Sequence, residues 1–148
     1  MKGTYLICIH LLESAQIKYG KKFSFKFPVG DYVYVGSALG NSGSSTLLNR
    51  VKRHVKNPKE KRNQWHIDYF LASRKTYIQS LYIIPSEIRL ECQIAQELSQ
   101  ISDHTINDFG SSDCDCNGHL FYFKEFKGFK EENLKLDIKK TDLSISSK

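Results

Sequence analysis

The segment formed by residues 4–11 most strongly limits how this chain can fold. Its alternate positions form two sets, and both are apolar: Tyr5, Ile7, Ile9 and Leu11 in one set, Leu6 and Cys8 in the other. This pattern predicts a β-strand that is covered on both faces.

Other segments predict further strands. Residues 21–27 alternate phenylalanine with lysine and serine, which is typical of a half-buried strand. Residues 28–31 then predict a turn into a strand at 32–35, so the two would form a small antiparallel meander. Residues 76–84 and 119–123 predict two more strands, and the glycine- and aspartate-rich residues 106–117 between the last elements predict a loop.

Residues 46–56 predict a helix that ends before Pro58, with Ser44 or Ser45 as its N-cap. A step of about 100° per residue groups its apolar side chains into one stripe, with Arg50 and His54 along the edge. The stripe consists of Leu47, Leu48, Val51 and Val55. The edge of a buried stripe is where a cleft begins, so we expect Arg50 and His54 to face one.

Two more helices are predicted. Residues 65–71 favour a short, heavily buried helix, and residues 85–100 a long one. The apolar face of the long helix would contain Ile88, Cys92, Ala95 and Leu98, and Glu91 falls within it. A buried carboxylate there needs a partner or a proton, because an unpaired buried charge is costly.

The organisation predicted is a single domain at residues 1–124 and a charged, serine-rich, mobile tail at 125–148. No apolar run is long enough for a membrane span and no signal-peptide core follows Met1, so we expect a cytoplasmic protein. Four cysteines are too few for a disulfide scaffold, which predicts reduced thiols. Lys and Arg number 22 against 16 Asp and Glu, and this balance of +6 favours polyanionic partners.

The chemistry-bearing residues point to a phosphodiesterase. Tyr5 and Tyr34 could act on the attacking water, Arg50 and His54 could contact a phosphate, and Glu91 could hold a metal ion. The alternative for the tyrosines is ordinary packing as core aromatics, and for the arginine a solvated surface charge.

Three motifs in this order resemble the GIY-YIG endonucleases: Gly3-Thr-Tyr5, Tyr34-Val-Gly36-Ser37-Ala38 and Arg50-Val-Lys-Arg-His54. Further motifs look like the Uri-type branch: Trp65-His-Ile-Asp-Tyr69, Glu91-Cys92, Phe109-Gly-Ser-Ser-Asp-Cys114 and His119-Leu-Phe-Tyr-Phe123. The resemblance runs from Gly3 to Phe123. It implies an α/β (α+β) fold with a small central antiparallel sheet flanked by helices. It also implies a Mg²⁺-dependent endonuclease that hydrolyses DNA phosphodiester bonds in repair or processing.

Within this hypothesis each residue has a role. Tyr5 is the preferred general base if a nearby cation lowers its pKa, and Tyr34 would orient the water or the phosphate. Arg50 would stabilise the charge of the transition state, and His54 would donate to the phosphate or shuttle a proton. By resemblance His66 is a second site histidine, although a core histidine fits the sequence equally well. Glu91 would bind Mg²⁺ or another divalent cation, its alternative being an ion pair that joins two helices.

The predicted DNA-binding residues lie next to this site. They are Ser37, Lys52, Arg53 and Lys56, and the charged residues Lys59, Lys61 and Arg62 extend the run. A solvated charged face is the alternative. No base-reading set is evident, so substrate preference would come from DNA shape or strandedness.

A cysteine and histidine group leaves a zinc site open. Cys114, Cys116 and His119, with Cys92 as a fourth donor, could form a tetrahedral set. The spacing is not that of a standard zinc finger, so we favour buried thiols. The family's last polar residue, usually an asparagine, could be Asn107 or Asn117. The rival functions are a DNA-binding module that does not cut and a small zinc-stabilised interaction protein.

Overall fold

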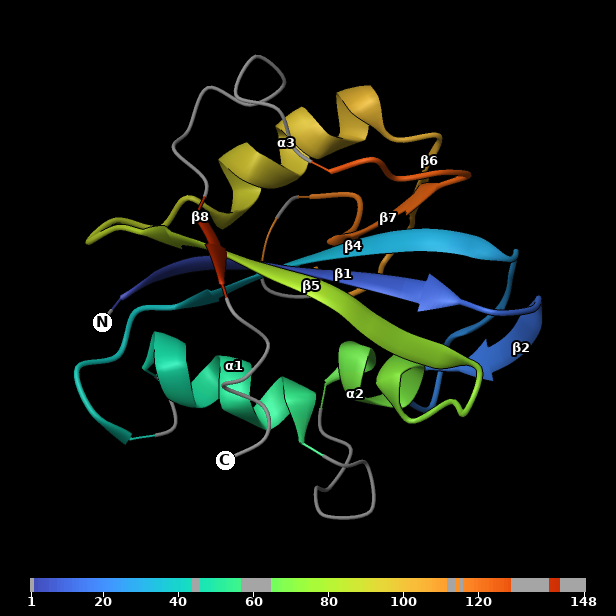
Figure 1. Cartoon of the computed structure of the whole chain (residues 1–148), viewed down its shortest axis with the longest axis horizontal. Helices are drawn as coiled ribbons and strands as arrows, with labels where there is room; N and C mark the ends of the chain where they lie inside the picture. The colour runs from blue at the N-terminus through green and yellow to red at the C-terminus, as the bar shows by residue number, and fades with distance from the viewer. Residues whose placement is uncertain are drawn as a thin grey trace.

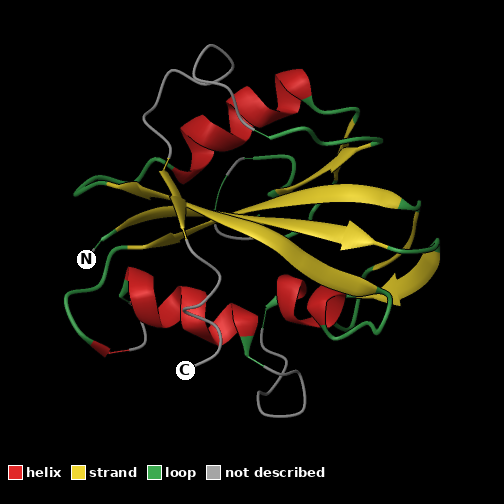
Figure 2. Ribbon diagram, viewed as in Figure 1, coloured by secondary structure: helices red, strands yellow, loops and turns green. Residues whose placement is uncertain are grey.

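The structure is a computed structural model that describes residues 2–43, 46–56, 65–111, 114, 116–128 and 139–141. A six-stranded antiparallel sheet in the order β6-β7-β4-β1-β5-β8 forms its centre. Helices α1 and α2 cover one face of this sheet and α3 covers the other (Figure 1, Figure 2). The predicted α+β fold, a central antiparallel sheet flanked by helices, is therefore confirmed.

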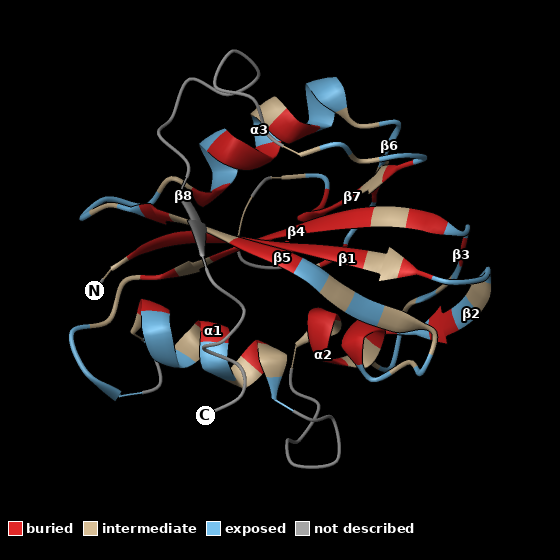
Figure 3. Cartoon of the chain, in the orientation of Figure 1, coloured by how far each residue is buried: buried red, intermediate tan, exposed pale blue. Residues whose placement is uncertain are grey.

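Strand β1 (Gly3–Leu11) is the centre of the sheet because it pairs along its whole length with two neighbours, β4 (Gly30–Ala38) and β5 (Thr76–Pro85). All but one of its residues are buried, as Figure 3 shows. Beyond β4 lie β7 (Leu120–Phe123) and the edge strand β6 (His104–Ile106), and β8 (Lys139–Thr141) pairs with β5 at the opposite edge. The prediction of a strand covered on both faces is confirmed.

The two sets of side chains on β1 enter two separate cores. Tyr5, Ile7 and Ile9 pack with residues of α1 and α2. Leu6 and Cys8 pack with Val33 and Val35 of β4 and with α3. Because both sets are apolar, each face of the sheet can bury a layer of helices.

Helix α1 (Leu47–Val55) begins after Thr46, whose hydroxyl accepts a hydrogen bond from the Asn49 backbone N–H. Ser44 and Ser45 lie outside the described residues, and the N-cap is Thr46. The buried residues of α1 are Leu47, Val51 and His54, while Leu48 is 46% exposed. The predicted stripe is therefore wrong at Leu48, and His54 lies inside the core instead of along the edge. Helix α2 (His66–Leu71) matches the predicted short buried helix.

Helix α3 (Glu91–Ile101) begins six residues later than the predicted start. Residues up to Pro85 continue β5, which pairs with β1 as far as Gly3, and the Ser86 backbone N–H then donates to the Lys2 carbonyl. Ile88, expected on the buried face, is 66% exposed. Glu91 is consequently the first residue of the helix.

The predicted meander is also wrong. Strand β3 (Ser24–Phe27) pairs with β2 (Ala15–Lys18), a strand that was not predicted, and this separate hairpin contacts α2. Its apolar side chains Ile17 and Phe27 face the core on the α1 and α2 side of the sheet. The turn at residues 28–30 leads from this hairpin into the main sheet.

The segment predicted as a tail includes β8, which lies on the sheet beside β5. The other predicted tail residues from 129 onward lie outside the described part of the chain. Within that part, no helix combines the length and the apolar character needed to cross a membrane.

Candidate active site

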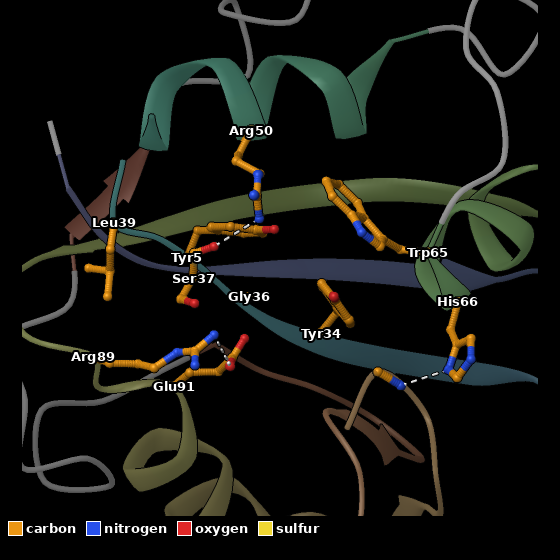
Figure 4. Close-up of a pocket in the computed structure, with 11 residues that line it drawn as sticks. Tyr5, Tyr34, Gly36, Ser37, Leu39, Arg50, Trp65, His66, Arg89 and Glu91 are labelled. Carbon is orange, nitrogen blue, oxygen red and sulfur yellow. Dashed lines mark hydrogen bonds and ion pairs between the residues drawn. The ribbon is translucent and has the colours of Figure 1, made fainter. Parts of the chain in front are cut away.

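A polar pocket of about 400 Å³ lies where β4 extends past its partner β7. Strand β7 pairs with β4 only as far as Tyr34, so in the described residues Gly36–Ala38 has β1 alone as its strand partner. Side chains from both faces of the sheet meet at this open edge (Figure 4). The lining residues are Tyr5, Tyr34, Gly36, Ser37, Leu39, Arg50, Trp65, His66, Arg89, Glu91 and Gly110.

The two tripeptides are neighbours in the sheet, because Tyr5 of β1 pairs in register with Gly36 of β4. The Tyr5 ring lies across Gly36, and a Cβ atom on Gly36 would collide with the phenol. Glycine is therefore required at this position so that the phenol can lie flat over the neighbouring strand. Gly3 has a separate reason, because a Cβ atom there would collide with the Ile84 carbonyl.

The Tyr5 hydroxyl lies 2.7 Å from Nε2 of His54, which is itself only 1% exposed. Burial raises the pKa of Tyr5 well above its ordinary value, although the nearby Arg50 guanidinium opposes this shift. The phenol is thus protonated at neutral pH, and His54 is in position to exchange a proton with it. His54 does not line the pocket but lies behind Tyr5.

Tyr34 lies beside Tyr5, with the two ring centroids 6.5 Å apart. Burial raises its pKa well above the ordinary value too, and the neighbouring Tyr5 and Glu91 add to the shift. Neither tyrosine is a ready base by itself, since each would have to form a phenolate in a buried site.

His66 lines the same pocket from the first position of α2. Its Nδ1 accepts a hydrogen bond of 2.9 Å from the backbone N–H of Gly110. Burial lowers the pKa of His66 from its ordinary value, although the carbonyl and charge of Asp108 oppose the shift. The neutral imidazole, with the proton on Nε2, is therefore the favoured form.

Two arginines of α1 lie over the Trp65 ring, but they differ in their partners. The Arg50 guanidinium carbon lies 4.7 Å from the ring centroid, and its Nη1 donates to the Ser37 carbonyl at 3.2 Å, which holds it at the pocket. Arg53 forms a bidentate ion pair with the fully buried carboxylate of Asp68, with both distances 2.8 Å. This pair joins α1 to α2.

Glu91 enters the pocket from α3, the helix on the other face of the sheet (Figure 4). Its side chain is 10% exposed, and its carboxylate oxygens lie 3.8 Å from Nη2 of Arg89 and 3.8 Å from Nδ1 of His119. Among the described residues that line the pocket, Glu91 supplies the carboxylate, and a hard divalent ion such as Mg²⁺ binds through one or two carboxylates together with substrate oxygens.

Six of the predicted site residues line one pocket: Tyr5, Tyr34, Ser37, Arg50, His66 and Glu91. The remaining predicted residues that the structure describes do not line it. Lys52 and Lys56 are exposed on α1, and Arg53 is engaged with Asp68. Neither Asn107 nor Asn117 is part of the pocket lining, and Lys59, Lys61 and Arg62 lie outside the described residues. The proposed roles of all these residues stay predictions.

Sequence reasoning missed Arg89 and Leu39, and it found Gly36, Trp65 and Gly110 only as members of motifs, without a role. The sequence predicts Arg89 within a helix at residues 85–100, where no pattern distinguishes it. Gly110 has a φ of +69° and brings its N–H to His66, so the Phe109-Gly110 turn was a usable signal.

A second cluster lies close to Glu91. The ligand atoms of Cys92, Cys114, Cys116 and His119 all lie within 4.8 Å of one another. These are the four residues whose side-chain types leave a zinc site open in the sequence.

A family model described as "Domain of unknown function DUF123" matches residues 4–140. No curated protein and no solved structure gives a significant match. The match covers nearly the whole chain, including the strands and helices that carry the pocket, and its description assigns no activity.

Proposed function

We propose that this chain, which belongs to the DUF123 family, is a metal-dependent endonuclease that hydrolyses DNA phosphodiester bonds. The observation that supports the proposal most directly is the pocket shared by two phenols, the Arg50 guanidinium and the Glu91 carboxylate. Such a set can activate a water molecule, neutralise a phosphate and hold a cation, which are the tasks of phosphodiester hydrolysis.

Tyr5 would serve as the general base through a proton relay. The attacking water would give its proton to the Tyr5 oxygen while Tyr5 passes its own proton to Nε2 of His54, 2.7 Å away. Because the two transfers are coupled, no free phenolate has to form. This resolves the difficulty that burial raises the pKa of Tyr5.

Arg50 would bind the non-bridging oxygens of the scissile phosphate. Its contacts with Trp65 and with the Ser37 carbonyl fix the guanidinium before the substrate arrives. A fixed donor costs little reorganisation as negative charge grows on phosphorus oxygens, and removing one such donor typically lowers the rate by about 10²–10³-fold.

Glu91 would hold a divalent ion such as Mg²⁺, which supplies Lewis-acid stabilisation of the oxygens around phosphorus. The carboxylate approaches from the side of the pocket opposite Arg50 (Figure 4). A phosphate between them would therefore meet a positive group on each side. Lys52 and Lys56, exposed on α1, would contact the DNA backbone next to the cut.

The proposal is tested by incubating the protein with labelled single-stranded, duplex, flapped and uracil-containing oligonucleotides, with and without Mg²⁺. We expect Mg²⁺-dependent cleavage that Tyr5→Phe and Arg50→Ala lower by at least about 10²-fold. Tyr77→Phe and Arg74→Ala are matched controls, because Tyr77 is 47% exposed, Arg74 is exposed and neither lines the pocket.

Salt-sensitive binding of these oligonucleotides without any cleavage by the unmutated protein would contradict the proposal. That result would instead favour a DNA-binding module on the same fold. Cleavage that survives both substitutions would show that another site carries the activity.

A further inference from the structure

We propose that Cys92, Cys114, Cys116 and His119 bind one structural zinc ion, and that His119 connects this ion to Glu91. The first part is independent of the proposed nuclease function. The second part concerns the same pocket, but its test below does not depend on catalysis.

The four donors are already close to the arrangement that zinc requires. All four ligand atoms lie within 4.8 Å of one another, and Sγ of Cys114 lies 3.4 Å from Nε2 of His119. In a tetrahedral site with Zn–S distances of about 2.3 Å the sulfur atoms are about 3.8 Å apart. Closing the remaining gap takes shifts of about 1 Å, which side-chain rotation can supply.

The fold brings these residues together from segments more than twenty positions apart. Three residues of helix α3 pack on Phe121 and Phe123 of β7: Ile94, Ala95 and Leu98. This packing holds the first turn of α3, which contains Cys92, next to the loop that precedes β7. That loop holds the other three donors. Gly118 lets it pass close to β6, since a Cβ atom there would collide with the Ile106 carbonyl.

The donor set selects the metal. Three thiols and one imidazole are soft and borderline ligands, which suit Zn²⁺ and not Mg²⁺. Four protein ligands close a tetrahedral site, which is typical of a structural and not a catalytic zinc. The cysteines also line a hollow with Ala95, Gln96 and Ser99, so an ion can reach them from solvent.

His119 links this site to the candidate active site. Its Nε2 faces the cysteines, while Nδ1 lies 3.8 Å from Oε2 of Glu91. A zinc-bound imidazole commonly donates its second N–H to a carboxylate, which fixes the orientation of both groups. In addition, Glu91 and Cys92 are consecutive residues of α3, so an ion held by Cys92 would fix the backbone that carries Glu91.

The zinc site is tested by metal analysis of the full chain, purified without a polyhistidine tag or chelator. We expect one zinc per chain, a thiolate-to-cobalt absorption band after Co²⁺ substitution, and loss of both in Cys114→Ser and Cys116→Ser. Cys8→Ala and His104→Asn are matched controls that should keep the metal, because Cys8 lies in the core below α3 and His104 is exposed on β6.

Two results would overturn the zinc site. One is wild-type protein that neither contains zinc nor gives a cobalt–thiolate band. The other is full zinc content in the two serine variants. Because a serine variant could fail to fold, the thiol-reagent-driven release of zinc from the wild-type protein provides a second measurement: release must follow modification of the cysteines.

The link to Glu91 is tested by ¹⁵N NMR of the histidine side chains. We expect His119 to show a metal-bound Nε2 and a protonated Nδ1, and Glu91→Gln to shift the Nδ1–H resonance while zinc content stays at one per chain. Glu97→Gln, on the same helix but outside the pocket lining, is the control. Identical His119 resonances in wild type and Glu91→Gln would overturn the link, whatever the nuclease assays show.

Discussion

The two sides of the candidate pocket are built differently. We call Tyr5, Arg50 and Trp65, together with His54 behind Tyr5, the α1 wall, and we call Arg89 and Glu91, together with His119 beside Glu91, the α3 wall. In the α1 wall the Tyr5–His54 contact is 2.7 Å, and just behind it both Arg53–Asp68 contacts are 2.8 Å. In the α3 wall the contacts of Glu91 with Arg89 and His119 are both 3.8 Å.

Folding therefore fixes one wall more firmly than the other. The short contacts of the α1 wall tie helices to β1 and to each other, so they contribute to stability as well as to the site. The two 3.8 Å contacts of Glu91 are longer than a hydrogen bond, so each contributes less to stability than the short contacts of the α1 wall. Substitutions in the α3 wall should therefore reduce activity, whereas those behind the α1 wall should also reduce stability.

The largest effect is expected for Glu91→Gln. Loss of the metal-binding carboxylate should lower Mg²⁺-dependent cleavage by about 10³-fold, while the melting temperature changes little. Glu97→Gln should keep full activity. A Glu91→Gln protein that unfolds at much lower temperature would show that the α3 wall is as structural as the α1 wall, which would contradict the comparison.

Arg53→Ala should have the next largest effect, and on stability. Removing Arg53 would leave the Asp68 carboxylate buried without its bidentate partner, a change that typically costs about 3–5 kcal/mol. Denaturant unfolding measures this cost. The neighbouring Lys52→Ala is the matched control, because Lys52 is exposed and should affect DNA affinity alone. Equal unfolding free energies of Arg53→Ala and Lys52→Ala would contradict a stabilising role of the Arg53–Asp68 ion pair, and would favour Arg53 as a DNA-binding residue.

Most of the fold could be predicted from patterns that depend on local geometry. The two apolar sets of β1 predict the central strand, and the 3.6-residue spacing of Leu47 and Val51 predicts α1. The start of α3 could not be predicted, because pairing with β1 as far as Gly3 overrides the helical pattern of residues 85–90. The β2–β3 hairpin was missed for a similar reason, since its burial depends on contact with α2.

The sequence could predict which residue types form the candidate site, but not which of these residues line the pocket and which lie behind it. The order of the motifs predicts Tyr5, Tyr34, Arg50 and Glu91 as site residues, and all four line one pocket. The sequence could not show that His54 lies behind Tyr5 or that Arg53 is taken up by Asp68, since both depend on how α1 is rotated against the sheet. The prediction that Cys92, Cys114 and Cys116 are buried thiols is wrong, because Cys92 is exposed and Cys114 and Cys116 are half-buried.

Gly36→Ala tests how firmly folding fixes the α1 wall. The added methyl group must displace the Tyr5 ring, because the ring lies directly over Gly36. Overpacking of this kind typically costs about 1–3 kcal/mol. We expect lower stability in denaturant and lower cleavage, whereas Ser37→Ala at the next position should keep stability. An unchanged unfolding free energy would show that the ring moves freely and that this wall is not rigid.

The smallest effect is expected from His66, which lies at the boundary between the two walls. Burial lowers its pKa in the folded protein relative to the unfolded chain, whose value is about 6.5. As the pH falls below this value, the unfolded chain binds a proton more readily than the folded protein, so the unfolding free energy decreases. Protonation of Nδ1 would also end its hydrogen bond with the Gly110 N–H.

The His66→Asn variant should keep an acceptor near Gly110 without titrating. The unfolding free energy of this variant should therefore fall less steeply than that of the wild type between about pH 7 and pH 5.5. Identical slopes for wild type and His66→Asn would mean that His66 is as solvated as an ordinary surface histidine, and that the pocket is wet at the point where the two walls meet.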